Sequence, residues 1–182
     1  MKTEPTARTR GTRGFTLIEL MLVVAMIGIL CSIAGVAWMR YVKRSRTTEA
    51  VGHLQKMWVG SIAYYESDHA DKNGTLLRRQ FPDGDDTAVE QDCCLAQQGR
   101  CLGNDPVYLT EPWLALGFNI SDSHLYRPVM RQTSDPTKNL WLEAWGNLDC
   151  DTVLAVFIRK ADVTAGGDVQ GYATPAVINE TE

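Results

Sequence analysis

Charge and proline are both absent from long stretches at the start of this chain. No charged residue occurs between Leu20 and Met39, and no proline occurs between Pro5 and Pro82. An uncharged apolar stretch of this length is unstable in water, and proline is the residue that most often interrupts a helix. The sequence therefore predicts one long helix over residues 15–70, and its first part is apolar on every side.

The chain also lacks the basic excess of a nucleic-acid-binding protein. The formal net charge is −4, and residues 1–14 contribute +3, from four Lys or Arg residues against Glu4. Since −4 minus +3 is −7, the rest of the chain is acidic. This distribution argues against a dominant nucleic-acid-binding surface.

Signatures of catalysis are missing as well. His53, His69 and His124 show no ligand spacing, and no serine lies in a nucleophile-elbow context. We expect His53 and His69 to be solvated residues on the helix surface. The sequence predicts no enzyme and no catalytic residue.

The apolar stretch is long enough to cross a membrane. The 25 residues from Phe15 to Met39 carry one charge, Glu19. As a helix they would reach about 37 Å, against a hydrocarbon core of roughly 30 Å. A cleaved secretory signal is the weaker alternative, because a small-x-small site at residues 32–34 lies inside a stretch that stays apolar to Met39. A plain uncleaved anchor is the simplest alternative to a processed span.

Glu19 argues for more than an anchor. A charged side chain near a membrane centre costs about 2.5 kcal/mol or more, so it usually has a partner. Gly14 lies at the junction between the basic leader and the apolar helix. If the chain is cut there, Phe15 gains a free ammonium that can pair with Glu19 of a neighbouring subunit.

The residues around this junction resemble the prepilin processing motif of type IV pilins and type II secretion pseudopilins. They read Arg13-Gly14-Phe15-Thr16-Leu17-Ile18-Glu19-Leu20-Met21, and the match continues through residues 23–30 and 46–50. The resemblance implies that a prepilin peptidase of the inner membrane cuts after Gly14 and methylates the amine of Phe15. It also implies that Glu19 serves assembly. Most members of the family carry a proline late in the span, where this chain has Val36. Many minor pilins also lack that proline.

The resemblance implies a structural role and a location. We expect a minor pilin of a type IV pilus-like filament, anchored in the inner membrane with its head in the periplasm before it enters a periplasmic or surface filament. Its expected partners are other pilin subunits, the prepilin peptidase and the inner-membrane assembly platform. A pseudopilin of a type II secretion system is the alternative within the family. A membrane-anchored periplasmic binding module or enzyme is the alternative from another class.

The rest of the chain predicts an α+β fold, with the long helix packed against a small antiparallel sheet. The expected organisation is a removed leader (1–14), a membrane and assembly segment (15–39), an amphipathic helix (40–70) and a globular head (71–182). The amphipathic helix has an apolar stripe at three- and four-residue spacing, formed by Ala50, Leu54, Met57, Trp58, Ile62 and Tyr65.

The head contains three β-rich runs, at about 124–133, 139–147 and 152–160, and a weaker run at 169–179 that suggests an edge strand. The run at 152–160 is apolar on both faces, as a central strand is. Short connections favour antiparallel pairing. Residues 111–117 are expected to form a short helix, with Pro112 at its first position.

Four head cysteines indicate two disulfide bonds in an oxidising compartment. A bond between the adjacent Cys93 and Cys94 is disfavoured by disulfide geometry. Two pairings remain open: Cys93–Cys101 with Cys94–Cys150, or Cys94–Cys101 with Cys93–Cys150. A four-thiolate zinc site is the alternative, although no C-x-x-C pair exists. Cys31 is expected to be a packing residue of the span.

The sequence predicts no cofactor, and it contains one candidate metal site. Asn147, Asp149 and Asp151 alternate oxygen-bearing side chains, as calcium loops do. The segment lacks the glycine and the distal glutamate of such a loop. A polar turn between two strands is the favoured interpretation.

Overall fold

The computed structural model describes residues 14–83, 92–132 and 135–180, so the predicted leader lies outside the described residues except for Gly14. The chain divides into two compact units, Met1–Met39 and Arg40–Glu182. Helix α1, Leu17–Glu66, contributes to both units, and the two are described separately. The long helix of the prediction is confirmed, although it ends at Glu66.

The first unit contains the apolar part of α1. Its large apolar side chains are all exposed, with fractions from 44% at Val23 to 81% at Phe15. By length and composition α1 is the one helix of the described residues that is able to cross a membrane. An apolar surface of this kind requires lipid or other helices around it.

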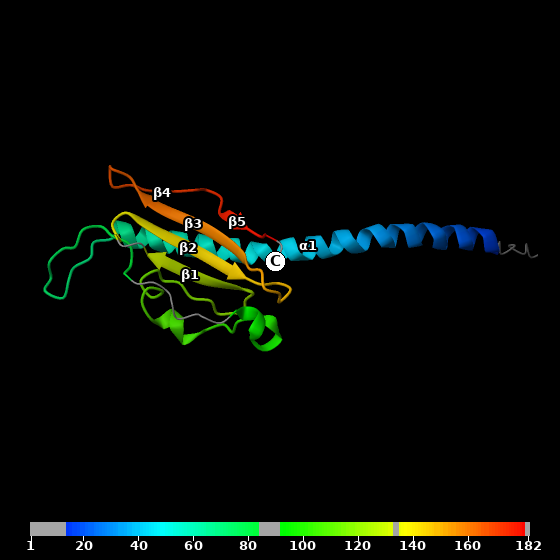
Figure 1. Cartoon of the computed structure of the whole chain (residues 1–182), viewed down its shortest axis with the longest axis horizontal. Helices are drawn as coiled ribbons and strands as arrows, with labels where there is room; N and C mark the ends of the chain where they lie inside the picture. Colours follow the sequence, from blue (N-terminus) through cyan, green and yellow to red (C-terminus); the bar gives the residue numbers. More distant parts are fainter. Residues whose placement is uncertain (1–13, 84–91, 133–134, 181–182) are drawn as a thin grey trace, which may run out of the picture. The chain divides into compact units, whose positions relative to one another are not determined.

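The second unit contains an antiparallel sheet. Its strands are β1 (Tyr126–Gln132), β2 (Asn139–Gly146), β3 (Ala155–Val163), β4 (Val169–Gly171) and β5 (Ala176–Ile178). The order is β1-β2-β3-β4, and β5 pairs with another part of β3 (Figure 1). The α+β class and the antiparallel pairing are therefore confirmed.

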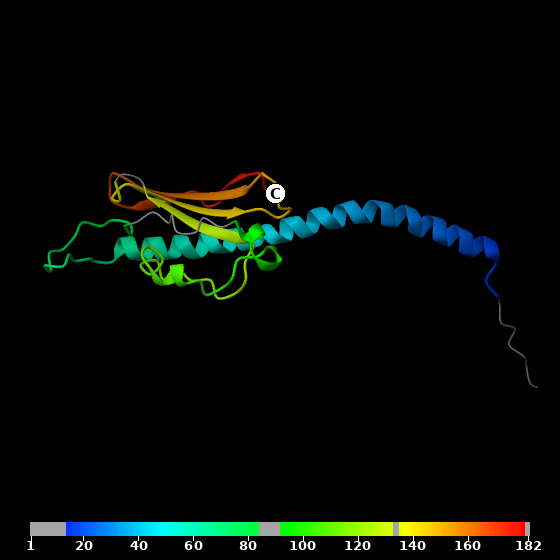
Figure 2. The same cartoon turned by 60° about the horizontal axis from the view of Figure 1, so that its bottom comes forward.

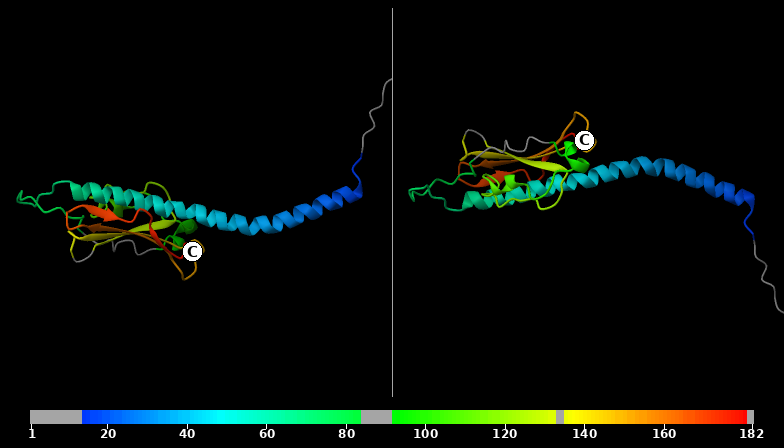
Figure 3. Two further views of the ribbon diagram at one scale, coloured as in Figure 1. Left: turned by 90° about the horizontal axis from the view of Figure 1, so that it is seen from above. Right: turned by 90° about the horizontal axis from the view of Figure 1, so that it is seen from below.

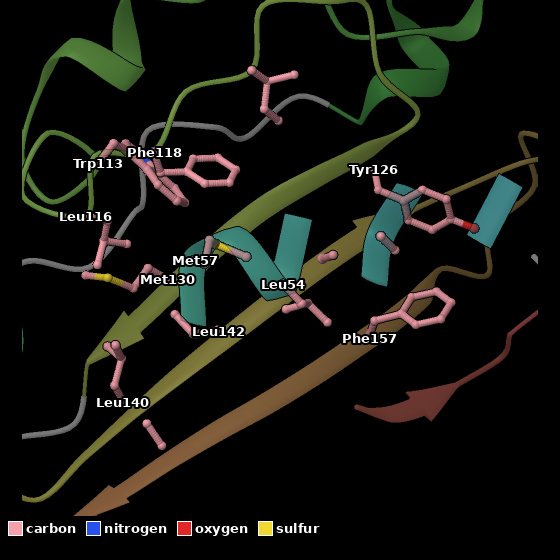
Figure 4. Close-up of a cluster of buried hydrophobic side chains, with 14 of the residues drawn as sticks. Leu54, Met57, Trp113, Leu116, Phe118, Tyr126, Met130, Leu140, Leu142 and Phe157 are labelled. Carbon is pink, nitrogen blue, oxygen red and sulfur yellow. The ribbon is translucent and has the colours of Figure 1, made fainter. Parts of the chain in front are cut away.

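The sheet and the second part of α1 form two layers. Figure 2 shows them edge on, and Figure 3 shows α1 along the sheet from two further directions. Leu54 and Met57 of α1 are fully buried and point toward Met130 and Leu142 of the sheet (Figure 4). Alternate residues of the strands face this core, as the period of two requires.

The predicted apolar stripe forms most of the helix side of the core. Ala50, Leu54, Met57 and Tyr65 are buried, whereas Trp58 and Ile62 are half-buried. The prediction for His53 was wrong: it is 7% exposed, because its ring packs between Phe118 and His124 of the segment that follows the disulfide loop. The spacing of the apolar stripe did not indicate that the segment containing Phe118 and His124 packs against α1.

Two predicted elements of the head differ from the structure. Residues 111–117 form successive turns rather than a helix, and Trp113 and Leu116 from this segment enter the core (Figure 4). The short helices of this region are the 3-10 helices η1 (Cys93–Leu95), η2 (Gln97–Gly99) and η3 (Pro106–Leu109). The run at 169–179 forms two short strands, β4 and β5, and Gly171 at the end of β4 lies beside the ring of Trp58.

A buried arginine joins α1 to β3. Arg159 is 9% exposed, donates to Oε1 of Gln55 at 2.6 Å and stacks over Trp58 with its guanidinium carbon 4.1 Å from the ring centroid. Burial lowers the pKa of Arg159. A Cβ placed on Gly171 would overlap the same Trp58 ring, so glycine is required for this close approach.

Candidate assembly site and head anchor

The predicted cleavage junction lies at the exposed start of the described chain. Phe15 is 81% exposed. A Cβ placed on Gly14 would meet no atom within 4 Å. Among the described residues, packing therefore does not require glycine at position 14.

Thr16 and Glu19 form a capping box at the start of α1. Oε2 of Glu19 accepts from the backbone N–H of Thr16 at 2.9 Å and from its hydroxyl at 2.7 Å. The hydroxyl oxygen of Thr16 accepts in turn from the backbone N–H of Glu19 at 3.3 Å. These bonds satisfy N–H groups that have no partner inside the helix. The sequence analysis did not identify Thr16, although the spacing Thr-x-x-Glu is visible in the sequence.

A second carboxylate, Glu49, attaches α1 to the head. The backbone N–H groups of Leu125 and Tyr126 both donate to Oε1 of Glu49, the second at 3.1 Å. Oε2 of Glu49 lies 3.7 Å from Nη2 of Arg100, and Oε1 lies 3.6 Å from Nε2 of His53. One side chain of the helix therefore contacts the start of β1 and the disulfide loop together.

Opposing effects act on the charge of this cluster. Burial raises the pKa of Glu49, but the adjacent His53 imidazole and the amides of Leu125 and Tyr126 lower it below its ordinary value overall. Burial lowers the pKa of His124, which is 4% exposed. The arrangement favours an ionised Glu49 beside a neutral His124.

The four head cysteines form two disulfide bonds. Cys93 pairs with Cys101, and Cys94 pairs with Cys150, which is one of the two pairings left open by the sequence. The first bond closes a small loop, and the second ties this loop to the turn between β2 and β3. Cys31 is a free, exposed cysteine of the apolar part of α1.

The candidate calcium residues each have a protein partner. The side-chain amide of Asn147 donates to Asp92 at 3.2 Å and to the carbonyl of Asp151 at 2.8 Å. Asp149 forms an ion pair with Lys43 at 3.0 Å. Asp151 accepts from the backbone N–H of Val153 at 2.6 Å, as in a polar turn. The calcium site stays a prediction.

These features define a class of protein with two parts. One is an apolar N-terminal helix whose capped start carries a carboxylate, and the other is an α+β head with disulfide bonds. The family model described as the prokaryotic N-terminal methylation motif matches residues 9–35. Fimbrial protein Q of Moraxella bovis is 57% identical over 42 residues, which cover 23% of this chain and 27% of that protein.

Two further relatives match over longer stretches. The type IV major pilin protein PilA of Myxococcus xanthus is 40% identical over 72 residues, 37% of this chain and 33% of that protein. A fimbrial protein of Moraxella nonliquefaciens is 55% identical over 78 residues, 43% of this chain and 44% of that protein. The chain therefore spans less than half the length of these relatives. No solved structure matches it.

The matches confirm the resemblance that the sequence indicated. The N-terminal segment of the chain carries the prokaryotic N-terminal methylation motif and is similar to type IV pilins and fimbrial proteins. The names of these relatives are those of pilins and fimbrial proteins, in agreement with the prediction that the chain is not an enzyme.

Proposed function

We propose that this chain is a structural subunit, and specifically a minor pilin, of a type IV pilus-like filament. The observation that carries the proposal is the exposed apolar surface of residues 15–39, which bears a single carboxylate beside the capped start of α1. Such a helix can be covered by the lipid of a membrane or by other apolar helices in a bundle. Val36, at a position where most of the family carries proline, supports the minor role.

Processing precedes assembly in this proposal. A prepilin peptidase of the inner membrane cuts after Gly14 and methylates Phe15, with the head on the periplasmic side. The open space around Gly14 supports a glycine selected by the peptidase rather than by the fold. The cut releases the charged leader, so that Phe15 carries the only remaining cation near Glu19.

The capping box indicates how Glu19 serves two partners. Both hydrogen bonds from Thr16 go to Oε2, and Oε1 of Glu19 makes no hydrogen bond within residues 14–83. We propose that Oε1 accepts the Phe15 ammonium of a neighbouring subunit while Oε2 keeps the helix start closed. A buried pair of this kind specifies register more than it adds stability, since a subunit out of register leaves a carboxylate unpaired.

The experiment compares two substitutions of Glu19 in cells that make the filament. Glu19→Ala should spare membrane insertion and the cut after Gly14, and should prevent or sharply reduce recovery in the sheared filament fraction. Glu19→Gln keeps a hydrogen-bond acceptor for Thr16 without the charge, so it separates capping from ion pairing. N-terminal sequencing of the membrane-extracted protein checks that both variants begin at Phe15.

The outcomes distinguish the alternatives. Normal incorporation of Glu19→Ala would refute the assembly role of the carboxylate. A wild-type chain that begins at Met1 would refute processing and favour an anchored binding module or enzyme. Processed wild-type protein that never enters the sheared fraction would favour a pseudopilin of a secretion system.

A further inference from the structure

The first disulfide bond lies beside a buried histidine. One ligand atom each from Cys93, Cys101 and His124 lies within 4.8 Å of the other two. Cys93 is 2% exposed and His124 is 4% exposed, whereas Cys101 is half-buried. Two thiolates and one imidazole are ligands that Zn²⁺ prefers.

The backbone holds these three residues in place. The N–H of Cys101 donates to the carbonyl of His124 at 2.9 Å, and the N–H of His124 donates to the carbonyl of Cys101 at 3.0 Å. Cys93 begins η1, where Asp92 caps the helix by accepting from the N–H of Cys94 at 3.1 Å. These bonds use backbone atoms and the Asp92 side chain, so neither sulfur atom takes part in them.

The imidazole of His124 has the orientation of a metal ligand. Its Nδ1 lies 3.2 Å from the backbone carbonyl of Asp122 and donates to it. A histidine that donates one ring N–H to a backbone carbonyl keeps the lone pair on the other nitrogen, and this is the usual outer contact of a metal-ligating histidine. Nε2 of His124 therefore carries the lone pair.

We propose that Cys93, Cys101 and His124 form a Zn²⁺ site in the reduced chain, and that formation of the Cys93–Cys101 disulfide releases the metal. Two sulfurs on a tetrahedral zinc lie about 3.8 Å apart. The Cα atoms of Cys93 and Cys101 are 4.6 Å apart, so side-chain rotation reaches this separation without movement of the backbone. Water takes the fourth position.

The two states exchange by a balanced reaction. When Zn²⁺ binds, the two thiols lose two protons and become thiolate ligands. When a disulfide oxidant of the compartment accepts two electrons from the two thiolates, its own S–S bond breaks and the S–S bond of Cys93 and Cys101 forms. The oxidant takes up two protons from solvent to become two thiols, and Zn²⁺ leaves. While zinc is bound, Cys93 and Cys101 are held together, and Cys94 is left to pair with Cys150. Zinc therefore selects the observed pairing from the two that the adjacent cysteines permit.

The test uses the full mature chain in detergent, with Co²⁺ as a spectroscopic probe for the zinc site. After reduction with a phosphine, the chain should bind equimolar Co²⁺ with a thiolate-to-cobalt charge-transfer band, and Zn²⁺ should displace it. The oxidised chain should show no such band. His124→Ala should weaken binding at least about tenfold. His69→Ala is the matched control and should leave binding unchanged.

A second measurement requires no variant. Reduced wild-type chain is alkylated with and without Zn²⁺, and each cysteine is quantified by mass spectrometry. Zinc should protect Cys93 and Cys101, whereas Cys94 and Cys150 should react. Equal protection of all four cysteines, protection of none, or unchanged Co²⁺ affinity in His124→Ala would each overturn the proposal.

Discussion

Removal of the Glu49 carboxylate tests whether one side chain attaches α1 to the start of β1. Glu49 accepts two backbone hydrogen bonds, and its side chain is 24% exposed. Hydrogen bonds to a charged group contribute about 1.5–3 kcal/mol each, and a buried N–H left without a partner has a similar cost. After an allowance for water that reaches the vacated site, Glu49→Ala should lower the free energy of unfolding by about 2–4 kcal/mol.

The charge of Glu49 gives a second, pH-dependent signature. Its pKa is lower in the folded chain than its ordinary value, so the folded state favours the ionised form. The resulting stability is fully present above the ordinary pKa of about 4.3 and is lost as the pH falls through the folded pKa. Glu49→Gln keeps an acceptor oxygen without a charge. It should cost less than Glu49→Ala at neutral pH and should flatten the loss of stability below about pH 4.3.

Urea denaturation followed by tryptophan fluorescence measures both effects, on a fragment that begins at Arg40. The compact second unit, Arg40–Glu182, contains every residue of this cluster. Lys56→Gln, a helix-surface change in the same unit, is the matched control. A cost below about 0.5 kcal/mol for Glu49→Ala, the range of ordinary surface substitutions, would refute the anchoring role.

Three further predictions concern the same fragment. The hydroxyl of Tyr126 is buried with no hydrogen-bond partner in the described part of the head. Tyr126→Phe should therefore stabilise the fold by about 1 kcal/mol in urea denaturation. A loss of stability would show that the hydroxyl has a partner. Gly171→Ala should destabilise the fold by about 1–3 kcal/mol, because the new Cβ would overlap Trp58. The control Gly52→Ala, which lies in mid-helix with open space around it, should stabilise the fold by about 0.5–1 kcal/mol. Equal effects of the two substitutions would contradict the close approach of Gly171 to Trp58. Removal of calcium with a chelator should leave the melting temperature unchanged, because the carboxylates of Asp149 and Asp151 already interact with Lys43 and with the backbone N–H of Val153. A lower melting temperature would indicate a bound ion.

The repeating elements were the predictable part of this fold. Three local patterns were visible in the sequence: the apolar span, the stripe on the amphipathic helix and the alternation of the strands. Such patterns are predictable because a buried face needs apolar residues at a fixed spacing. The helix was predicted to reach residue 70 and ends at Glu66, where a hairpin fixed by Asp71 begins. The main strands were predicted to within a few residues, and β3 is the central strand that its apolar sequence indicated.

The contacts between distant segments were not predictable. Glu49 reaches amides 76 and 77 residues away, and no local pattern indicates that they meet. His53 looked like a surface residue because the helix period places it beside the stripe rather than in it. The segment from Cys93 to Phe118 has no regular pattern, and its packing against α1 decides which side chains are buried.

Two of the carboxylates of α1, Glu19 and Glu49, have different kinds of partner. Glu19 and Glu49 both lie in the N-terminal stretch that resembles the prepilin motif and its continuation. In the described part of the chain, Glu19 contacts Thr16 within its own helix, whereas Glu49 contacts backbone N–H groups of a distant segment. A carboxylate that binds backbone amides needs no particular side chain opposite it. The sequence of the segment opposite Glu49 can therefore vary while this contact between the helix and the head is kept.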